Sequence, residues 1–242
     1  MTGKTHEIYT ALRGRLASGE LRVGERVSEQ SLAAELRVSR TPVREAIKRL
    51  QADGYFDQVH RYGTVVRAPS MQEIVEVYDL REAIETHVVL HGDADRFAAI
   101  DAELDASCEA LEELACEFGS RPLEAPGGAL VQRLFDLDAR FHDAIVSTSS
   151  NGRFESIVGH ARLFSQIHSV RRHSIITFEI VMGIHRDHTA VLRHLRGRDL
   201  PAAADALRRH IRGGKEGAVD WLRLQDRMRG ASPANAVSAK AF

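Results

Sequence analysis

The chain has 242 residues, 43% of them hydrophobic and 28% charged, and its formal net charge is −1. That size suits one large domain or a small domain joined to a medium one. No apolar run reaches the roughly 18 residues of a membrane span, and the N-terminus MTGKTHEIYT lacks the apolar segment of a secretory signal. We therefore expect a cytoplasmic protein.

The first 68 residues predict a small domain in which helices precede a β-hairpin. Apolar residues at helical spacing open the chain, and residues 19–27 predict a turn or short strand. Ser28 and Ser39 are placed to cap two further helices. Two β-like runs then flank a turn at Tyr62-Gly63. This order of elements is that of a winged helix-turn-helix.

The rest of the chain predicts an all-helical body. Ser70 and Glu73 form a capping box, and no strand pattern competes after residue 70. The candidate helices cover residues 71–92, 94–118, 129–148, 152–174, 177–196 and 200–228. We predict a mainly α protein with three parts: a winged helix-turn-helix DNA-binding domain (1–68), an α-helical domain for metal, effector and dimer contacts (69–229) and a disordered tail (230–242).

The helix that follows Ser39 has the polar surface of a DNA-reading helix. Residues 1–70 contain twelve Lys and Arg against eight Asp and Glu, a net charge of +4, which leaves −5 for the remainder. A basic head attracts phosphate, and exposed polar residues at the start of a recognition helix reach base edges. An ordinary solvated helix would show the same spacing. The candidate contacts are Arg40, Thr41 and Arg44, with Lys48 and Arg49 for phosphates.

Polar residues interrupt the apolar stripes of three body helices. In DLDARFHDAI, Asp138 and His142 both fall on the apolar face, and His188 and His210 interrupt other helices in the same way. Brought together in the core, one carboxylate and three imidazoles could coordinate Zn²⁺, Ni²⁺ or Mn²⁺. An Asp–His ion pair and separately satisfied core histidines would explain the same pattern, and His185 could compete as a ligand.

Arg81 also lies on an apolar helical face and is therefore expected to point inward. A buried guanidinium needs an anionic partner. That partner could be Glu85, one turn later, or the carboxylate of a bound metabolite. The further candidates for contact with such an effector are His168, Arg171 and Asn151.

The segment LASGELRVGERVSEQSLAAELRVSRTPVREAIKRLQADGY resembles the DNA-binding head of the GntR family of bacterial transcription factors. The resemblance implies DNA contacts by Ser39, Arg40, Thr41 and Arg44, and a wing from Arg61 to Gly63 at the minor groove. Arg37 stands where the family usually has glycine, so we expect a left-handed backbone there at some energetic cost.

The body resembles the FCD ligand-binding domain of the FadR subfamily. Its metal-binding members have Asp-x3-His, a later His, and another His 22 residues on, a pattern that Asp138, His142, His188 and His210 reproduce. The resemblance implies a divalent metal, with Zn²⁺ first, and an effector contact by an arginine of the first helix, here Arg81. It further implies a metabolite-responsive regulator, commonly a repressor, that binds double-stranded operator DNA as a homodimer.

Two other functions are compatible with these residues. The metal itself could be the signal, in which case chelation alone would change DNA affinity. A metal-dependent hydrolase would need a general base, for which Glu85 or His185 could serve. A DNA-binding head argues against the hydrolase, and we expect no enzyme.

Overall fold

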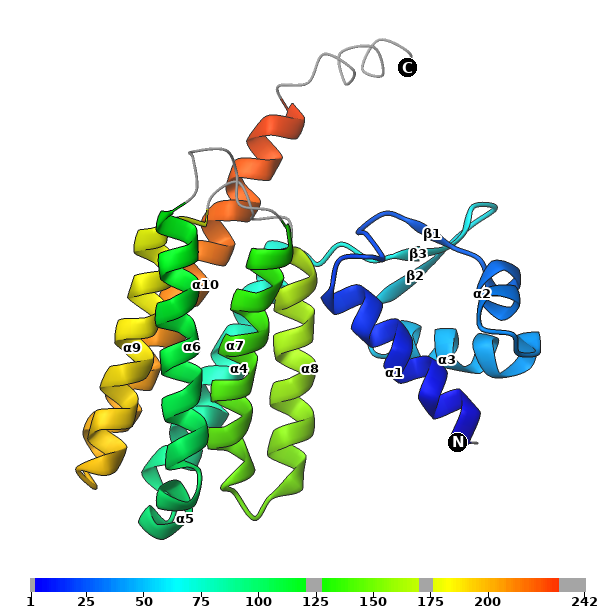
Figure 1. The fold of residues 1–242 in the computed structure, drawn as a ribbon. Helices are drawn as coiled ribbons and strands as arrows, with labels where there is room; N and C mark the ends of the chain where they lie inside the picture. Colours follow the sequence, from blue (N-terminus) through cyan, green and yellow to red (C-terminus); the bar gives the residue numbers. More distant parts are fainter. Residues whose placement is uncertain (1–2, 121–127, 170–175, 231–242) are drawn as a thin grey trace.

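The computed structural model describes residues 3–120, 128–169 and 176–230. It shows a small head beside an elongated bundle of helices (Figure 1). Residues 231–242, nearly all of the predicted tail, lie outside the described residues. Within the described ranges, no helix combines the length and the apolar character needed to cross a membrane.

The head is a winged helix-turn-helix, as predicted. Its elements are α1 (Gly3–Ala17), β1 (Arg26–Val27), α2 (Glu29–Glu35), α3 (Arg40–Ala52), β2 (Phe56–Val59) and β3 (Gly63–Val66). The strands form an antiparallel sheet in the order β1-β3-β2, with Val27 opposite Thr64 and Phe56 opposite Val66. Residues 19–27 thus end in a strand, which extends the predicted hairpin to three strands.

Local chemistry accounts for the boundaries of the head helices. The Ser28 side chain accepts a hydrogen bond from the Ser31 amide and so caps α2. Arg37, directly after that helix, has a φ of +53°, which confirms the expected left-handed backbone. Arg61 in the wing turn is also left-handed, with a φ of +60°. Leu12 and Leu50 are almost fully buried where the three helices meet.

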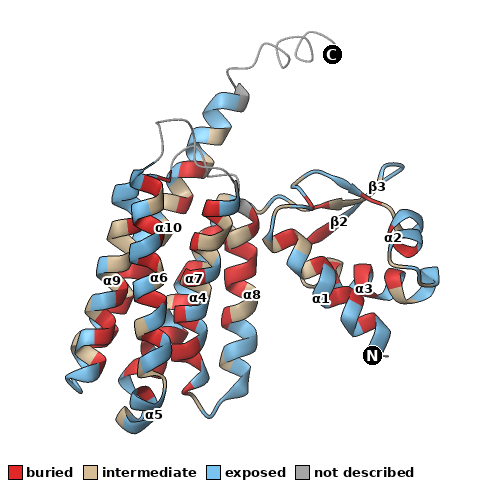
Figure 2. Cartoon of the chain, in the orientation of Figure 1, coloured by how far each residue is buried: buried red, intermediate tan, exposed pale blue. Residues whose placement is uncertain are grey.

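The body consists of helices packed lengthwise. They are α4 (Met71–Leu90), α5 (Ala94–Ala99), α6 (Asp101–Gly119), α7 (Gly128–Ser147), α8 (Gly152–Ser169), α9 (Phe178–Arg196) and α10 (Leu200–Gly230). Their buried residues lie on the faces that point into the bundle (Figure 2). The predicted capping box of Ser70 and Glu73 starts α4.

The prediction of a single helix over residues 94–118 is wrong, because the helix is interrupted at Ile100 and forms α5 and α6. Neither glycine nor proline marks this break. The ring of Phe97 is buried against Gly92, where an added Cβ would lie only 2.6 Å from ring atoms. The short α5 brings Phe97 into this contact, and α6 then starts in a new direction.

Helix α8 packs against the head (Figure 1). The Tyr55 hydroxyl lies 2.7 Å from Nδ1 of His160. Burial lowers the pKa of His160 and raises the pKa of Tyr55, so both groups are neutral and the hydroxyl donates to the ring. Arg13 donates to the carbonyl of Gly159 at 3.4 Å, and the Arg67 guanidinium lies over the ring of Phe164. Hydrogen bonds and ring contacts therefore set the orientation of the head.

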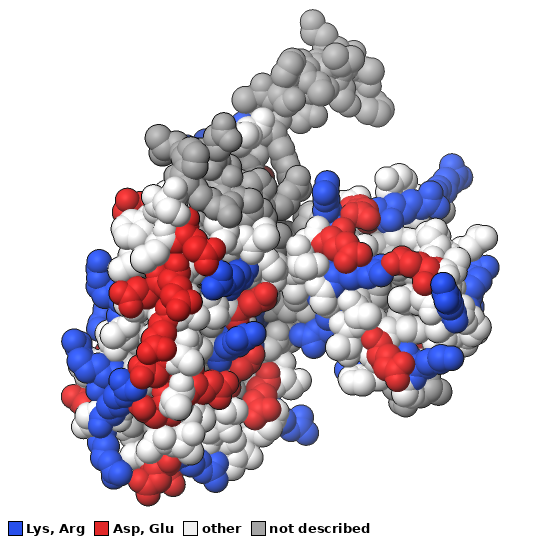
Figure 3. Space-filling model, in the orientation of Figure 1, with Lys and Arg blue, Asp and Glu red and all other residues white. Residues whose placement is uncertain are grey.

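The charge division seen in the sequence persists on the surface. Acidic side chains gather over α6 on the face drawn in Figure 3, whereas basic side chains stand out at the outer edge of the head. A positively charged head on a negatively charged body favours contact between DNA and the head alone.

Replacement of Arg37 by glycine tests the backbone strain at the end of α2. Glycine adopts a positive φ without a Cβ clash, so we expect R37G to raise the free energy of unfolding by about 0.5–1 kcal/mol. Chemical denaturation of the full chain measures the change. R37A is the control, because it removes the same side chain but keeps the strained backbone. Equal stability of R37G and R37A would contradict the prediction.

Candidate metal centre and DNA interface

Three helices bring four polar side chains to one point in the bundle. Asp138 and His142 come from α7, His188 from α9 and His210 from α10. His142 and His188 are fully buried, and His210 is 8% exposed. One ligand atom from each residue lies within 4.8 Å of the others. The sequence-predicted set is therefore a cluster in space, and His185 is not part of it.

The spacing of the donor atoms fits a divalent transition metal. Nε2 of His210 lies 3.2 Å from Oδ1 of Asp138, 3.1 Å from Nε2 of His142 and 3.3 Å from Nε2 of His188. A tetrahedral site with bonds of about 2.0–2.1 Å has edges of about 3.3 Å. Imidazole nitrogens with a carboxylate are the donor set that Zn²⁺, Ni²⁺ and Mn²⁺ accept.

Without a metal ion, two of the histidines in the cluster differ in protonation at neutral pH. Burial lowers the pKa of His188 to about 3, so this ring is neutral at pH 7. Burial alone would also lower the pKa of His210, but hydrogen bonds to Asp138 and Asp187 outweigh it and raise the pKa to about 9. Burial likewise opposes ionisation of Asp138, yet the three histidines hold its pKa well below the usual range. At neutral pH, His210 thus carries a proton that a metal ion would displace.

Glu85 connects the cluster to Arg81. Its fully buried carboxylate accepts hydrogen bonds from Nδ1 of His142 and, at 2.9 Å, from Nε of Arg81. Burial would raise the pKa of Glu85, but its interactions with His142 and Arg81 outweigh burial and lower the pKa to about 2. A carboxylate on Nδ1 fixes the tautomer that leaves the Nε2 lone pair for a metal.

The sequence placed Glu85 only as a partner of Arg81 or as a general base. The Arg81 pairing is confirmed, and so is the inward direction of Arg81, which is 4% exposed. The contact with His142 was missed, because it joins residues 57 positions apart. The sequence did contain one indication that Glu85 points inward: it lies one helical turn after Arg81, on the same inward face.

The other two rings are oriented in different ways. Nδ1 of His210 lies 3.5 Å from Oδ2 of Asp187. The ring of His188 stacks on Phe141, with centroids 3.8 Å apart and an interplanar angle of 10°. Nδ1 of His188 is buried and has no hydrogen-bond partner among the residues that the structure describes. On the Nδ1 side, packing against Phe141 rather than a hydrogen bond therefore orients the ring of His188.

A cavity of about 280 Å³ adjoins the cluster. Asp138, His210 and Arg81 lie in its wall, so a molecule inside can reach both a metal ion and the guanidinium. The rest of the wall combines apolar side chains with glycines, Tyr78 and Asp187. Its apolar side chains are Leu134, Phe135, Ile176, Ile180, Ile184 and Ile211.

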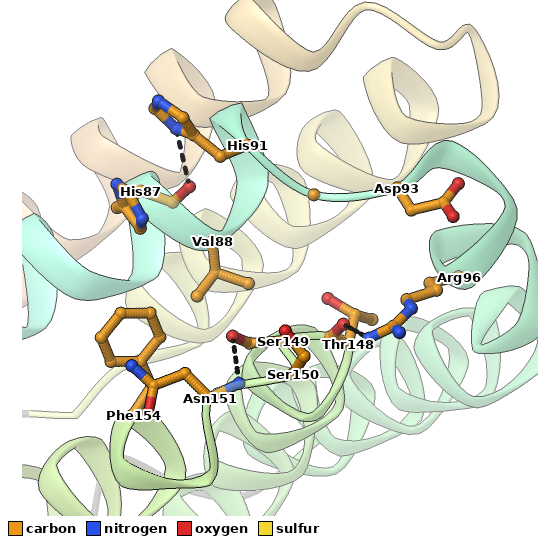
Figure 4. A pocket seen from close by; sticks show the side chains of 11 residues that line it. His87, Val88, His91, Asp93, Arg96, Thr148, Ser149, Ser150, Asn151 and Phe154 are labelled. Carbon is orange, nitrogen blue, oxygen red and sulfur yellow. Dashed lines mark hydrogen bonds between the residues drawn. The ribbon is translucent and has the colours of Figure 1, made fainter.

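Of the other predicted effector residues, Asn151 is described, and it does not line this cavity. Asn151 lines a separate hollow of about 410 Å³ where α4 ends, beside His87, His91 and Arg96 (Figure 4). The Asn151 side chain accepts a hydrogen bond from the Arg153 amide at 3.2 Å and so caps α8. The His168 side chain and Arg171 lie outside the described residues.

The start of α3 presents the predicted DNA contacts to solvent. Ser39 is the N-cap, but its hydroxyl makes no capping hydrogen bond. Arg40 pairs with Glu29 at 3.5 Å, and Thr41 and Arg44 are exposed. Exposed side chains at a helix N-terminus are positioned to meet base edges and phosphates.

The remaining predicted DNA residues differ in how they are held. Lys48 is exposed, with Glu45 at 3.6 Å. The Arg49 guanidinium packs over the ring of Tyr9, 4.2 Å from its centroid, so it also joins α3 to α1. Arg61 is exposed at the tip of the wing, and Gly63 has a φ of +106° where β3 begins.

Comparison with known proteins identifies relatives of both parts. Residues 4–66 match "Bacterial regulatory proteins, gntR family", and residues 76–213 match the FCD domain. An uncharacterized HTH-type transcriptional regulator of Streptomyces ambofaciens is 29% identical over 87% of this chain and 84% of its own length. The gluconate operon transcriptional repressor of Bacillus subtilis is 40% identical over 92 residues, which are 38% of this chain and 35% of the repressor.

A solved structure has the same fold. The E. coli protein McbR/YncC superposes with a TM-score of 0.74 at 18% identity, covering 91% of this chain and 99% of that chain. At this identity the likeness concerns the fold alone.

Replacement of Glu85 tests its role in positioning His142. Removing such a partner typically weakens metal binding 10- to 100-fold, so we expect E85Q to lower Zn²⁺ affinity by at least about tenfold. Competition with a chromogenic chelator measures the affinity. E82Q is the control, because Glu82 lies on the same helix but pairs with Arg212. The same affinity in both variants would show that Glu85 does not support the site.

Proton release tests the raised pKa of His210. At pH 7 this ring is protonated, since its pKa is about 9, whereas His188 is already neutral. A ligating imidazole must lose its proton, so binding should release about one proton from His210 and affinity should rise with pH up to about 9. Calorimetry in buffers of different ionisation enthalpy counts the protons. Binding without proton release at pH 7 would contradict the assignment.

Proposed function

Because the chain belongs to the gntR family of bacterial regulatory proteins and carries an FCD domain, we propose that it is a repressor controlled by a metal-bound small carboxylate. The chain is a DNA-binding transcriptional regulator, and its family consists of regulators rather than enzymes. The naming of a related gluconate operon protein as a repressor supports the sign of regulation.

The convergence of Asp138, His142, His188 and His210 carries the metal part of the proposal. These residues would hold a divalent ion, with Zn²⁺ preferred because three imidazoles and a carboxylate match its usual ligands. A bound ion would supply a positive charge and open coordination positions at the cavity wall. Arg81 would orient the effector carboxylate from the other side of that cavity.

Helix α8 is the proposed route from the cavity to DNA. Arg162 of α8 donates to the Ala139 carbonyl and to Asp143, both on the helix that carries His142. His160, two residues earlier on α8, contacts Tyr55 of the head. A shift of α7 when an effector binds would therefore alter the placement of the head. In a homodimer that change would mismatch the two heads and the operator half-sites.

The proposal keeps the predicted division of the chain. Residues 1–68 read DNA through Ser39, Arg40, Thr41, Arg44 and the wing, and residues 69–229 bind metal, effector and a second copy. Lys48 and Arg49 would contact phosphates, which accept positive charge at many positions. Because bacterial operators lie in the cytoplasm, the protein would act there.

Loss of Arg40 and Arg44 tests the DNA interface. Each bidentate base contact is worth about 1–3 kcal/mol, so we expect R40A and R44A each to weaken operator binding about 10- to 100-fold. An operator selected from a random duplex pool serves as the target. R223A is the control, because Arg223 is similarly exposed but lies on the last body helix. Unchanged binding by R40A and R44A would refute the assignment of α3.

Chelation distinguishes the proposed function from direct metal sensing. If the metal were the signal, removing it would change operator affinity with no acid present. Under the proposal, the metal-loaded protein responds to added acid, and chelation abolishes that response. Fluorescence anisotropy of a labelled operator, with and without chelator and acid, separates the two.

A further inference from the structure

We propose that the cavity beside the metal centre selects a small monocarboxylate with an apolar body, rather than a dicarboxylate or a polyhydroxylated acid. This inference rests on the proposed function and names the chemical class of its effector. It follows from the charge balance at the polar end of the cavity and from the side chains along the rest of its wall.

A divalent ion with its four ligands would carry one net positive charge, since three neutral imidazoles and ionised Asp138 leave +1. Arg81 adds none, because Glu85 balances it within the buried pair. One carboxylate would therefore neutralise the ion and its ligands. Asp187 lines the same cavity and adds a negative charge, so a second carboxylate would meet repulsion there.

Arg81 retains the groups needed to orient that carboxylate. Among the residues that the structure describes, Arg81 donates a hydrogen bond from Nε to the Glu85 carboxylate. The two terminal amino groups of the guanidinium remain for a ligand in the cavity that Arg81 lines. A planar guanidinium matches a carboxylate through paired hydrogen bonds.

The wall away from this end is suited to hydrocarbon. Leu134 and Phe135 come from α7, and Ile180 and Ile184 from α9. A hydroxyl or second carboxylate placed among them would lose water without gaining a hydrogen bond. A methylene chain or ring would instead gain from burial.

Glycines make the space for such a body. Gly183 of α9 and Gly213 of α10 line the cavity, and a Cβ added at either would meet no atom within 4 Å. Each glycine in a helix interior costs about 1 kcal/mol relative to alanine, so these helices give up stability along the cavity. The 280 Å³ volume equals roughly nine waters, enough for an acid of about ten non-hydrogen atoms.

A matched series of acids tests the proposed class. The full chain is loaded with Zn²⁺ and titrated calorimetrically with acetate, butyrate and hexanoate, and then with adipate and gluconate. We expect affinity to rise roughly three- to fourfold per methylene group. Adipate and gluconate should each bind at least about tenfold more weakly than hexanoate. A flat series, or adipate or gluconate as tight as hexanoate, overturns the inference.

Two isoleucines provide matched variants. Ile180 lines the cavity and is 38% exposed, whereas Ile157 on α8 is 39% exposed and does not line it. I180N should weaken hexanoate about tenfold and leave acetate unchanged, and I157N should change neither. R81Q should weaken every acid alike. Unchanged hexanoate binding by I180N overturns the assignment of the apolar wall.

The same samples separate this inference from the proposed function. Metal content and operator binding of the wild-type protein are measured alongside the titrations. Failure to bind metal or operator refutes the proposed function. Intact metal and operator binding, with none of the acids bound or with polar acids preferred, refutes only the inference about the effector.

Discussion

Three buried imidazoles meet one half-buried carboxylate inside an apolar bundle, and such a group is stable only with compensating charge and fixed orientation. Glu85 and Arg81 extend the group by a buried ion pair that orients His142. The resulting chain of contacts crosses α4, α7, α9 and α10. The packing of these four helices therefore involves the polar centre as well as the surrounding leucines and isoleucines.

The same centre explains the position of the cavity. Asp138, His210 and Arg81 face inward here, so apolar side chains do not fill the space between the helices completely. Glycines on α9 and α10 leave further space beside them. The cavity is polar at the centre and apolar beyond it. Under the proposed function, effector binding, metal coordination and stability would share one set of residues, and this sharing would couple an effector to the arrangement of the helices.

Particular residues show how far sequence reasoning reaches. The left-handed backbone at Arg37 and the capping box at Ser70 follow from local chemistry, and both were predicted. The helix break at Ile100 was not predicted. It accompanies the packing of the Phe97 ring against Gly92, and no glycine or proline stands at the break to indicate it. Asn151 was grouped with the effector residues, yet it lines a hollow at another part of the body.

The sequence by itself determined the order of elements, the exposed polar face at the start of α3 and the inward direction of five polar residues, namely Asp138, His142, Arg81, His188 and His210. Helical periodicity fixes the direction of a side chain, because each residue turns the helix by a constant angle. Only the tertiary structure decided which inward groups meet. His188 joins the cluster, while His185, three residues earlier, contacts Thr189. Glu85 of α4 contacts His142 of α7 directly. Those outcomes depend on how the helices rotate and pack against one another, which spacing along a single helix does not specify.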